Sequence, residues 1–148
     1  MIGIKPKYCQ YSLGACDQAD ADASYAGTFF IFPNDPPQIS TSIQLAIEEL
    51  RRQEDSRRWT SWKDLKIAGK LIFCEICKAI RNADLVIADI TTLNFNVLFE
   101  IGYALGVGTP ILQIRDSSFV RDSHLFNDLG LLDTIGYIDF QNSKDLCQ

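Results

Sequence analysis

Histidine is almost missing from the sequence, since His124 is the only one and no serine or cysteine signature lies beside it. We therefore do not expect His124 to take part in nucleophilic catalysis. Neither a GxGxxG segment nor a Walker-type GxxxxGK(S/T) segment is present, which argues against a glycine-rich loop that cradles phosphate. No apolar run reaches the roughly 18 residues of a membrane span. The N-terminus has no apolar core followed by a small-residue cleavage site, so we expect a cytoplasmic protein without membrane contact.

Positive charge is also limited, because 14 lysines and arginines face 19 acidic residues and the net charge is −5. The densest basic cluster is interleaved with Glu54, Asp55 and Asp64, as on a solvated helical face. It consists of Arg51, Arg52, Arg57, Arg58, Lys63, Lys66 and Lys70. We therefore predict no direct nucleic-acid partner.

Cysteine is more frequent, with five residues, which we expect to be mostly reduced in the cytoplasm. Cys74 and Cys77 are three residues apart in a helical pattern and face roughly the same way. With Cys9 and Cys16 they could form a tetrahedral zinc site. The apolar neighbours of the pair favour the alternative, in which both are small buried hydrophobic residues. We expect no metal and no cofactor.

Apolar runs and helical periodicity predict one α/β domain over residues 27–148, after an irregular polar N-terminal extension over residues 1–26. The two adjacent prolines of PNDPP are expected to exclude a helix there, and Ser40 or Thr41 to cap the next one. Residues 59–62 fit either a short edge strand or a long loop. The expected strands are 28–32, 85–90, 111–114 and 134–140, and the expected helices are 42–52, 65–82 and 96–106.

Strands that alternate with helices imply right-handed βαβ units and a parallel sheet. We predict a flavodoxin-like three-layer sandwich with four or five strands in the order 2-1-3-4-5. Ligands bind such sheets beyond the carboxyl ends of the strands where the order reverses, here between strands one and three. The two loops at that point contain Pro33, Asn34, Asp35, Asp89, Thr91, Thr92, Asn94 and Asn96. Taken singly, each residue has an alternative: an asparagine there caps the helix, and the prolines end a strand.

The strongest candidate is Glu100, the only charged residue in NVLFEIGYALGV. Such a helix is expected to be buried nearly all round, so its one acid should be functional or paired. A cap at Asn94 or Asn96 places Glu100 within the first two turns, near the positive end of the helix dipole. Its side chain is then expected to project toward the crevice, and Tyr103 lies three residues on, on the neighbouring face. A solvent-exposed glutamate is the alternative.

The segment ADLVIADITTLNFNVLFEIGYALGVGTPILQI, residues 83–114, resembles the core motif of the nucleoside 2-deoxyribosyltransferase-like proteins and their TIR-like relatives. That motif is a strand that ends in Asp, an Asn-x-Asn-Val loop, Glu-x-Gly-x-Ala on a helix, and a proline before the next strand. The matching residues are Asp89, Asn94, Asn96, Val97, Glu100, Gly102, Ala104 and Pro110. FIFPND at the end of the first strand also resembles the substrate loop of the family, so the resemblance implies that Pro33, Asn34 and Asp35 contact substrate.

The resemblance implies that Glu100 attacks or stabilises the anomeric carbon of a ribosyl group while its N-glycosidic bond breaks. Asp89, Asn94 and Asn96 would hold sugar hydroxyls or orient Glu100, with Thr91 and Tyr103 beside them. Two positions depart from the family pattern. Deoxyribosyltransferases often carry Asp six residues before the Glu, where this chain has Asn94, which weakens base protonation. The Trp-Cys pair and serine of TIR-type NAD hydrolases are absent and replaced by residues 95–99.

Three hypotheses follow. The first is an N-glycosidase that acts on a nucleotide, with NAD+ as the first candidate, in a bacterial defence or signalling system. The second is a nucleoside or nucleotide 2-deoxyribosyltransferase or hydrolase, and the third is a non-catalytic nucleotide-binding or self-associating module. A small domain offers a shallow crevice, so we also expect a homo-oligomer or a place in a larger effector assembly. Phe95, Phe99, Trp59 and Trp62 are the candidate interface residues, with core packing as the alternative for at least two of them.

Overall fold

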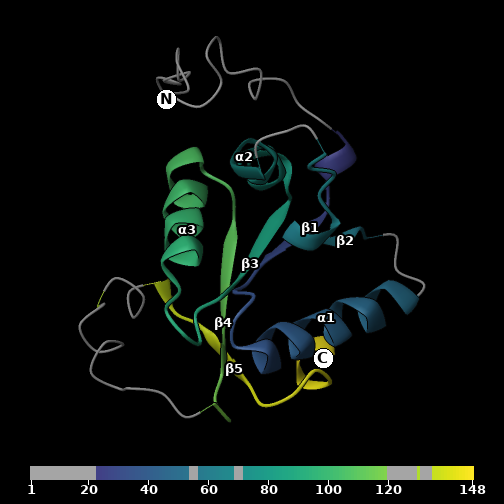
Figure 1. Ribbon diagram of the computed structural model, residues 1–148, viewed down its shortest axis with the longest axis vertical. Coiled ribbons are helices and arrows are strands. Elements are labelled where there is room, and N and C mark those ends of the chain that lie inside the picture. Colours follow the sequence, from purple (N-terminus) through teal and green to yellow (C-terminus); the bar gives the residue numbers. More distant parts are fainter. Residues whose placement is uncertain (1–22, 54–56, 69–71, 120–129, 131–134) are drawn as a thin grey trace.

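The computed structural model describes residues 23–53, 57–68, 72–119, 130 and 135–148. Five parallel strands form one sheet in the order β2-β1-β3-β4-β5, which confirms the predicted topology (Figure 1). The strands are β1 (Thr28–Ile31), β2 (Trp59–Ser61), β3 (Leu85–Asp89), β4 (Ile111–Asp116) and β5 (Ile138–Phe140). The continuous apolar run of β1 is buried along its whole length, as expected for a central parallel strand that is covered on both faces.

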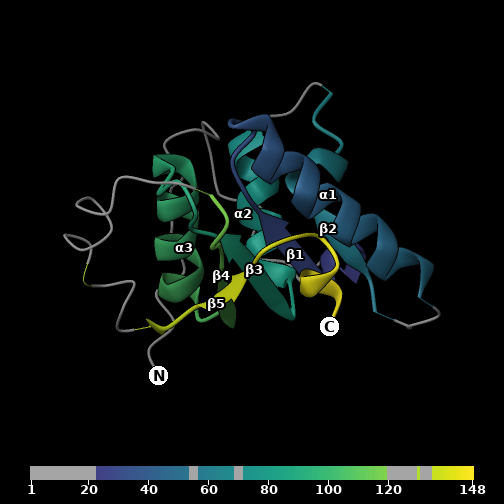
Figure 2. The ribbon, with the colours of Figure 1, turned by 90° about the horizontal axis from the view of Figure 1, so that it is seen from below.

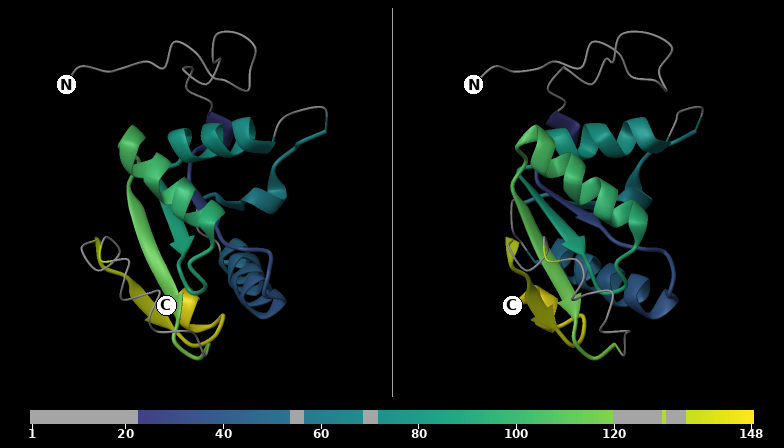
Figure 3. Two further views of the ribbon diagram at one scale, coloured as in Figure 1. Left: turned by 60° about the vertical axis from the view of Figure 1, so that its left-hand side comes forward. Right: turned by 90° about the vertical axis from the view of Figure 1, so that its left-hand side faces the viewer.

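Helices cover both faces of this sheet and complete the predicted three layers (Figures 2 and 3). The helices are α1 (Pro37–Arg52), α2 (Ile72–Asn82) and α3 (Phe95–Val107). Alternate side chains of β1 point to opposite faces, so Phe29 and Ile31 pack with α2 and α3 while Phe30 packs with α1. The sheet is therefore a rigid platform with two helices above one face.

Helix α1 begins earlier than predicted, at Pro37, with Pro36 as the N-cap residue and no side-chain cap. The expectation that two prolines exclude a helix, and that Ser40 or Thr41 caps it, is wrong. Proline suits the first helical position because the N–H that it lacks would have no partner there, and its φ is already helical. The Asp35–Pro36 peptide bond is cis. Because β1 ends at Ile31 and α1 begins at Pro37, the loop between them is short and holds Asn34 and Asp35 at the edge of the sheet.

The region between α1 and α2 contains the edge strand β2, which decides between the two alternatives for residues 59–62. A 3-10 helix, η3 (Trp62–Asp64), follows and is closed by a capping box between Ser61 and Asp64. Leu65, after η3, has extended backbone angles, and α2 begins at Ile72, so a helix from residue 65 is wrong. The capping box between Ser61 and Asp64 starts only this single 3-10 turn, and the extended backbone at Leu65 ends it before the apolar helical pattern begins.

Part of the predicted extension packs on the domain. Residues 1–22 lie outside the described part, while Ala23–Tyr25 form a 3-10 helix, η2. The Tyr25 ring packs against the cluster beneath α2 and α3, and its hydroxyl donates to Glu75 Oε2 at 2.5 Å. Of the final strand predicted over 134–140, Ile138–Phe140 is β5 and Thr134 lies outside the described residues. Among the described helices none is long and apolar enough to cross a bilayer.

Helix α3 is not buried all round, contrary to expectation. Val97, Ile101 and Ala104 face the core, whereas Phe95 is 87% exposed and Phe99 is 53% exposed. A helix with a single charged residue was expected to be covered on every side. The outer face of α3 is instead apolar and open.

Candidate functional site

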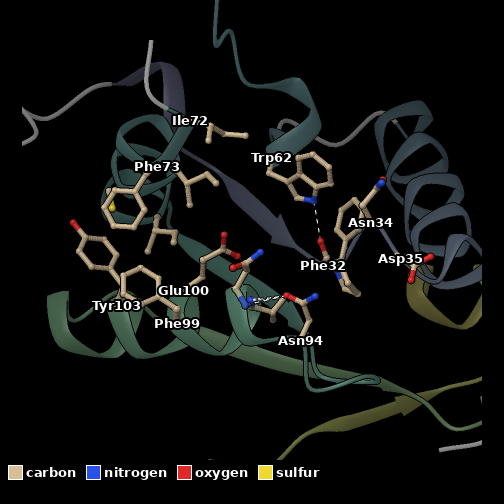
Figure 4. A pocket seen from close by; sticks show the side chains of 16 residues that line it. Phe32, Asn34, Asp35, Trp62, Ile72, Phe73, Asn94, Phe99, Glu100 and Tyr103 are labelled. Carbon is tan, nitrogen blue, oxygen red and sulfur yellow. Dashed lines mark hydrogen bonds between the residues drawn. The ribbon is translucent and has the colours of Figure 1, made fainter. Parts of the chain in front are cut away.

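A cavity of about 690 Å³ opens between α2, α3 and the carboxyl end of β1 (Figure 4). This volume is in the range that binds small molecules. The lining residues are Phe32, Pro33, Asn34, Asp35, Trp62, Ile72, Phe73, Ile76, Cys77, Ile80, Asn94, Asn96, Val97, Phe99, Glu100 and Tyr103. Of the residues predicted at the crevice, Asp89, Thr91 and Thr92 do not line it, and the others do. The loop after β1 therefore meets α3 and the loop before it, which are distant from β1 in sequence, at the predicted edge of the sheet.

Asp89 and Thr91 lie behind the cavity, where they are 1% and 0% exposed. The Thr91 hydroxyl donates to Asp89 Oδ2 at 2.7 Å, and the Thr91 N–H donates to Asp89 Oδ1 at 3.2 Å. Thr91 Oγ1 also accepts from the Asp116 N–H at 2.8 Å and so ties the end of β3 to the end of β4. We therefore reassign both residues from substrate contact to positioning, because their polar atoms hold the loop that leads to α3.

Asn94, and not Asn96, caps α3. Its Oδ1 accepts from the backbone N–H of Asn96 at 2.9 Å and of Val97 at 3.3 Å, which satisfies two of the N–H groups that a helix start leaves open. Leu93 before it has a φ of 52°, which turns the chain from the sheet into the helix. Asn96 stays exposed at the cavity. The cap fixes where α3 starts and hence where Glu100 points.

Glu100 lies in the second turn of α3, and its carboxyl group points into the middle of the cavity (Figure 4). Loss of water around the half-buried side chain raises its pKa to about 7. The cavity supplies no opposing cation, since no lysine or arginine is among its described lining residues. Near neutral pH the group can therefore exist both as an acid and as a carboxylate. The prediction that Glu100 projects toward the crevice is confirmed.

Aromatic side chains form much of the cavity wall. The Phe73 ring of α2 packs against the Phe99 ring of α3 with centroids 5.4 Å apart. At the other end the Trp62 indole N–H donates to the carbonyl of Phe32 at 2.9 Å, and the two rings lie 5.9 Å apart. Figure 4 shows Glu100 between these two groups. A bound ligand with a flat ring could therefore stack on aromatic side chains on either side of the Glu100 carboxylate.

The α2 side of this wall was not predicted. Ile72, Phe73, Ile76 and Cys77 have the spacing of an ordinary core-facing helix, and only the packing of α2 beside α3 leaves a gap between them. The one available signal was the helical spacing itself, which does not separate a core face from a cavity face. For Trp62 the sequence predicts an interface or a core position, and not a place in the cavity wall.

Tyr103 lines the cavity one turn beyond Glu100. Burial is the main reason why the pKa of its hydroxyl is raised, with Cys77 acting in the same direction and Arg81 opposing it. The hydroxyl is therefore protonated at neutral pH and can donate a hydrogen bond.

No metal centre is evident in the described part of the chain, where no group of three or more histidine, cysteine, aspartate or glutamate residues is placed to hold an ion. Cys77 is buried and lines the cavity, in agreement with the apolar interpretation of this cysteine. Cys9, Cys16 and His124 lie outside the described residues, so the four-cysteine zinc site stays a prediction.

Comparison with known proteins adds no assignment, because no protein-family model matches the sequence and no curated protein is similar enough to count as a relative.

Proposed function

We propose that the protein is an N-glycosidase that breaks the bond between a ribosyl group and a base, with NAD+ as the first candidate substrate. The observation that carries the proposal is a half-buried carboxylate at the centre of an aromatic cavity, with no lysine or arginine among the described residues that line it. Support also comes from the resemblance of residues 83–114 to the deoxyribosyltransferase-like and TIR-like motif. A role in bacterial defence or signalling is proposed from that resemblance alone.

The chemistry suits one carboxylate. Cleavage of an N-glycosidic bond passes through an oxocarbenium-like state in which positive charge develops at the anomeric carbon. Ionised Glu100 would lie beside that carbon and either stabilise the charge or form a bond to it, after which water takes the ribosyl group. Asn96 and Asn94, on the same side of the cavity, would orient the sugar, while Asn34 and Asp35 would contact it from the β1 loop.

The leaving group favours NAD+ over ordinary nucleosides. When nicotinamide leaves, the bonding electron pair neutralises its ring nitrogen, so no acid has to protonate the base. A neutral nucleoside base needs such a proton, and the only other carboxylate that lines the described cavity is Asp35 on the β1 loop. Position 94, where the deoxyribosyltransferases often carry an acid, holds the capping amide of Asn94. For these reasons the deoxyribosyltransferase hypothesis is second.

The binding-module hypothesis has its own support in the exposed apolar face of α3. Such a surface is typical of a protein that associates with a partner. In that case the cavity would bind a nucleotide without cleaving it.

The decisive experiment incubates the protein with NAD+, NADP+, CMP and deoxynucleosides and detects released base by chromatography. We expect nicotinamide release from the dinucleotides and a loss of at least about 100-fold in kcat for Glu100→Gln. Glu48→Gln removes an exposed acid from α1 and serves as the matched control. Absence of turnover by the wild type across the whole panel, even at high protein concentration, would rule out the enzyme and leave the binding module.

A further inference from the structure

The ionisable groups around the cavity are unbalanced in sign. Its described lining residues include two carboxylates, Asp35 and Glu100, and no lysine or arginine. The cations near the cavity lie outside its described lining. Lys63 donates to Ser40 Oγ at 2.8 Å, and its Nζ lies over the Trp62 and Phe32 rings, 5.3 and 5.7 Å from their centroids. Lys78 lies 3.8 Å from Glu75, and Arg81 interacts with the Tyr103 hydroxyl. A positively charged group beside Glu100, on the side away from Lys63, would therefore meet a carboxylate and no cation among the described lining residues.

The aromatic walls act in the same direction. Phe73, Phe99 and Tyr103 lie on one side of Glu100, and Trp62 and Phe32 lie on the other (Figure 4). The face of an aromatic ring carries partial negative charge and attracts a cation within about 6 Å. The same faces stack with a flat heterocycle. Lys63 already lies over the Trp62 and Phe32 rings, so the rings left for a ligand cation are Phe73, Phe99 and Tyr103. On that side a heteroaromatic ring with a positive charge would benefit from both effects and from Glu100 at once.

We propose that this cavity selects N-ribosides whose base carries a fixed positive charge, a class that includes pyridinium nucleotides and N7-alkylated purine nucleosides. The substrate side of this inference rests on the proposed N-glycosidase activity. In the reaction the bond between C1′ and the ring nitrogen breaks, and its electron pair neutralises the nitrogen. Water adds to C1′, and its proton passes to Glu100 or to solvent. The base leaves neutral, so no acid is consumed.

The prediction extends beyond NAD+. We expect the cavity to bind purine nucleosides whose base is positively charged and not those whose base is neutral. 7-Methylguanosine and guanosine differ by one methyl group and one charge, as do 1-methylnicotinamide and nicotinamide. The added methyl group is small, but it also removes the ring nitrogen as a hydrogen-bond acceptor. The part of the preference that disappears in Glu100→Gln therefore reports the charge.

The test measures binding first, so that it does not depend on turnover. Quenching of tryptophan fluorescence, to which Trp62 at the cavity and Trp59 both contribute, gives the Kd of 1-methylnicotinamide and of nicotinamide, with calorimetry as a second method. We expect the cation to bind at least about tenfold more tightly. Glu100→Gln should remove most of that preference, and Phe99→Leu, which keeps apolar bulk but lacks the ring, should reduce it. Asp35→Asn changes the exposed carboxylate at the β1 loop and should have a smaller effect.

Turnover is measured separately with 7-methylguanosine and guanosine, each corrected for its spontaneous rate and compared with the Glu100→Gln protein. We expect enzymatic release only from the methylated nucleoside. Equal binding of 1-methylnicotinamide and nicotinamide by the wild type overturns the charge preference, even if NAD+ is cleaved and the proposed function holds. Tight selective binding without any turnover supports the charge preference and overturns the glycosidase. Because the two ligands are compared on the wild-type protein, this result does not depend on whether a variant folds.

Discussion

Glu100 shows how one residue takes its chemical properties from its surroundings. A carboxyl group in water ionises near pH 4.5, whereas loss of water around this side chain raises its pKa to about 7. Most carboxyl groups in folded proteins gain a hydrogen bond or a cation that lowers the pKa, and they stabilise the fold when ionised. Glu100 has the opposite shift, so its ionised form destabilises the folded state. That is the expected signature of a residue kept for chemistry rather than for stability.

This shift predicts a pH-dependent gain in stability for Glu100→Gln. The folded-state pKa exceeds the unfolded-state value, so the stability linked to the neutral carboxyl is fully present below about pH 4.5 and is lost as the pH rises through about 7. Glutamine has the same shape and never ionises. We expect the free energy of unfolding of Glu100→Gln to exceed that of the wild type by about 2 kcal/mol at pH 8 and by little at pH 4.5.

Urea denaturation of both proteins at several pH values between 4.5 and 8 measures this difference. The Glu48→Gln variant, which changes an exposed residue of α1, should show a flat difference over the same range. A flat difference for Glu100→Gln as well would mean that its carboxyl is solvated, and would contradict the account of the site.

At the scale of the element, α3 depends on how it begins. Asn94 satisfies two backbone N–H groups, and Thr91 and Asp89 hold the loop before it by hydrogen bonds at 2.7 and 3.2 Å. These polar residues look like ligand-binding groups in the sequence because they are gathered at the edge of the sheet. Some of these residues are there to form local hydrogen bonds. The polar groups left to bind a ligand in the cavity are those of Asn96, Glu100 and the β1 loop.

The cap gives a prediction with two contrasting variants. Asn94→Ala removes both hydrogen bonds and should lower the free energy of unfolding by about 1 kcal/mol. Asn94→Asp keeps the acceptor oxygen and adds negative charge at a helix N-terminus, so it should be nearly neutral or slightly stabilising. Denaturant unfolding at pH 7 measures both. Asn96→Ala is the control at the neighbouring exposed asparagine; a loss there equal to that of Asn94→Ala would show that the cap is assigned to the wrong residue.

The elements that the sequence predicts well are those with a strong period or a continuous apolar run, such as β1, β3 and α3. The sheet order follows from their alternation, and Glu100 follows from its isolation in an apolar helix. The predicted helix boundaries are wrong where the same local sequence pattern is compatible with two structures. The prolines of PNDPP predict a helix-free segment, but proline also suits the first helical position, where Pro37 lies. The apolar spacing predicts a helix from residue 65, but the chain is extended at Leu65 after a single 3-10 turn. The α2 wall of the cavity depends on the packing of two helices, which no local pattern contains.

At the scale of the whole molecule, α3 joins the cavity to the outer surface. Phe99 lines the cavity and is still 53% exposed, and Phe95, Gly102, Leu105 and Gly106 continue an exposed face that carries no charge. A partner that binds the outer face of α3 would therefore also contact Phe99, a residue of the cavity wall. A twofold contact places each residue opposite its own copy or a near neighbour, so an uncharged face is free of the repulsion that like charges would cause. The predicted homo-oligomer therefore has a candidate surface.

We predict that the protein self-associates through this face of α3. Phe95→Lys should convert the dimer to a monomer at micromolar concentration, because the exposed ring is replaced by a charge that meets its own copy across the twofold axis. The substitution should not unfold the domain, since Phe95 is 87% exposed and does not line the cavity. Leu45→Lys places the same charge on an exposed position of α1 and should leave the dimer intact. Sedimentation velocity over a concentration series measures both, and either a monomeric wild type at all concentrations or equal dissociation by Leu45→Lys would exclude this surface as the interface.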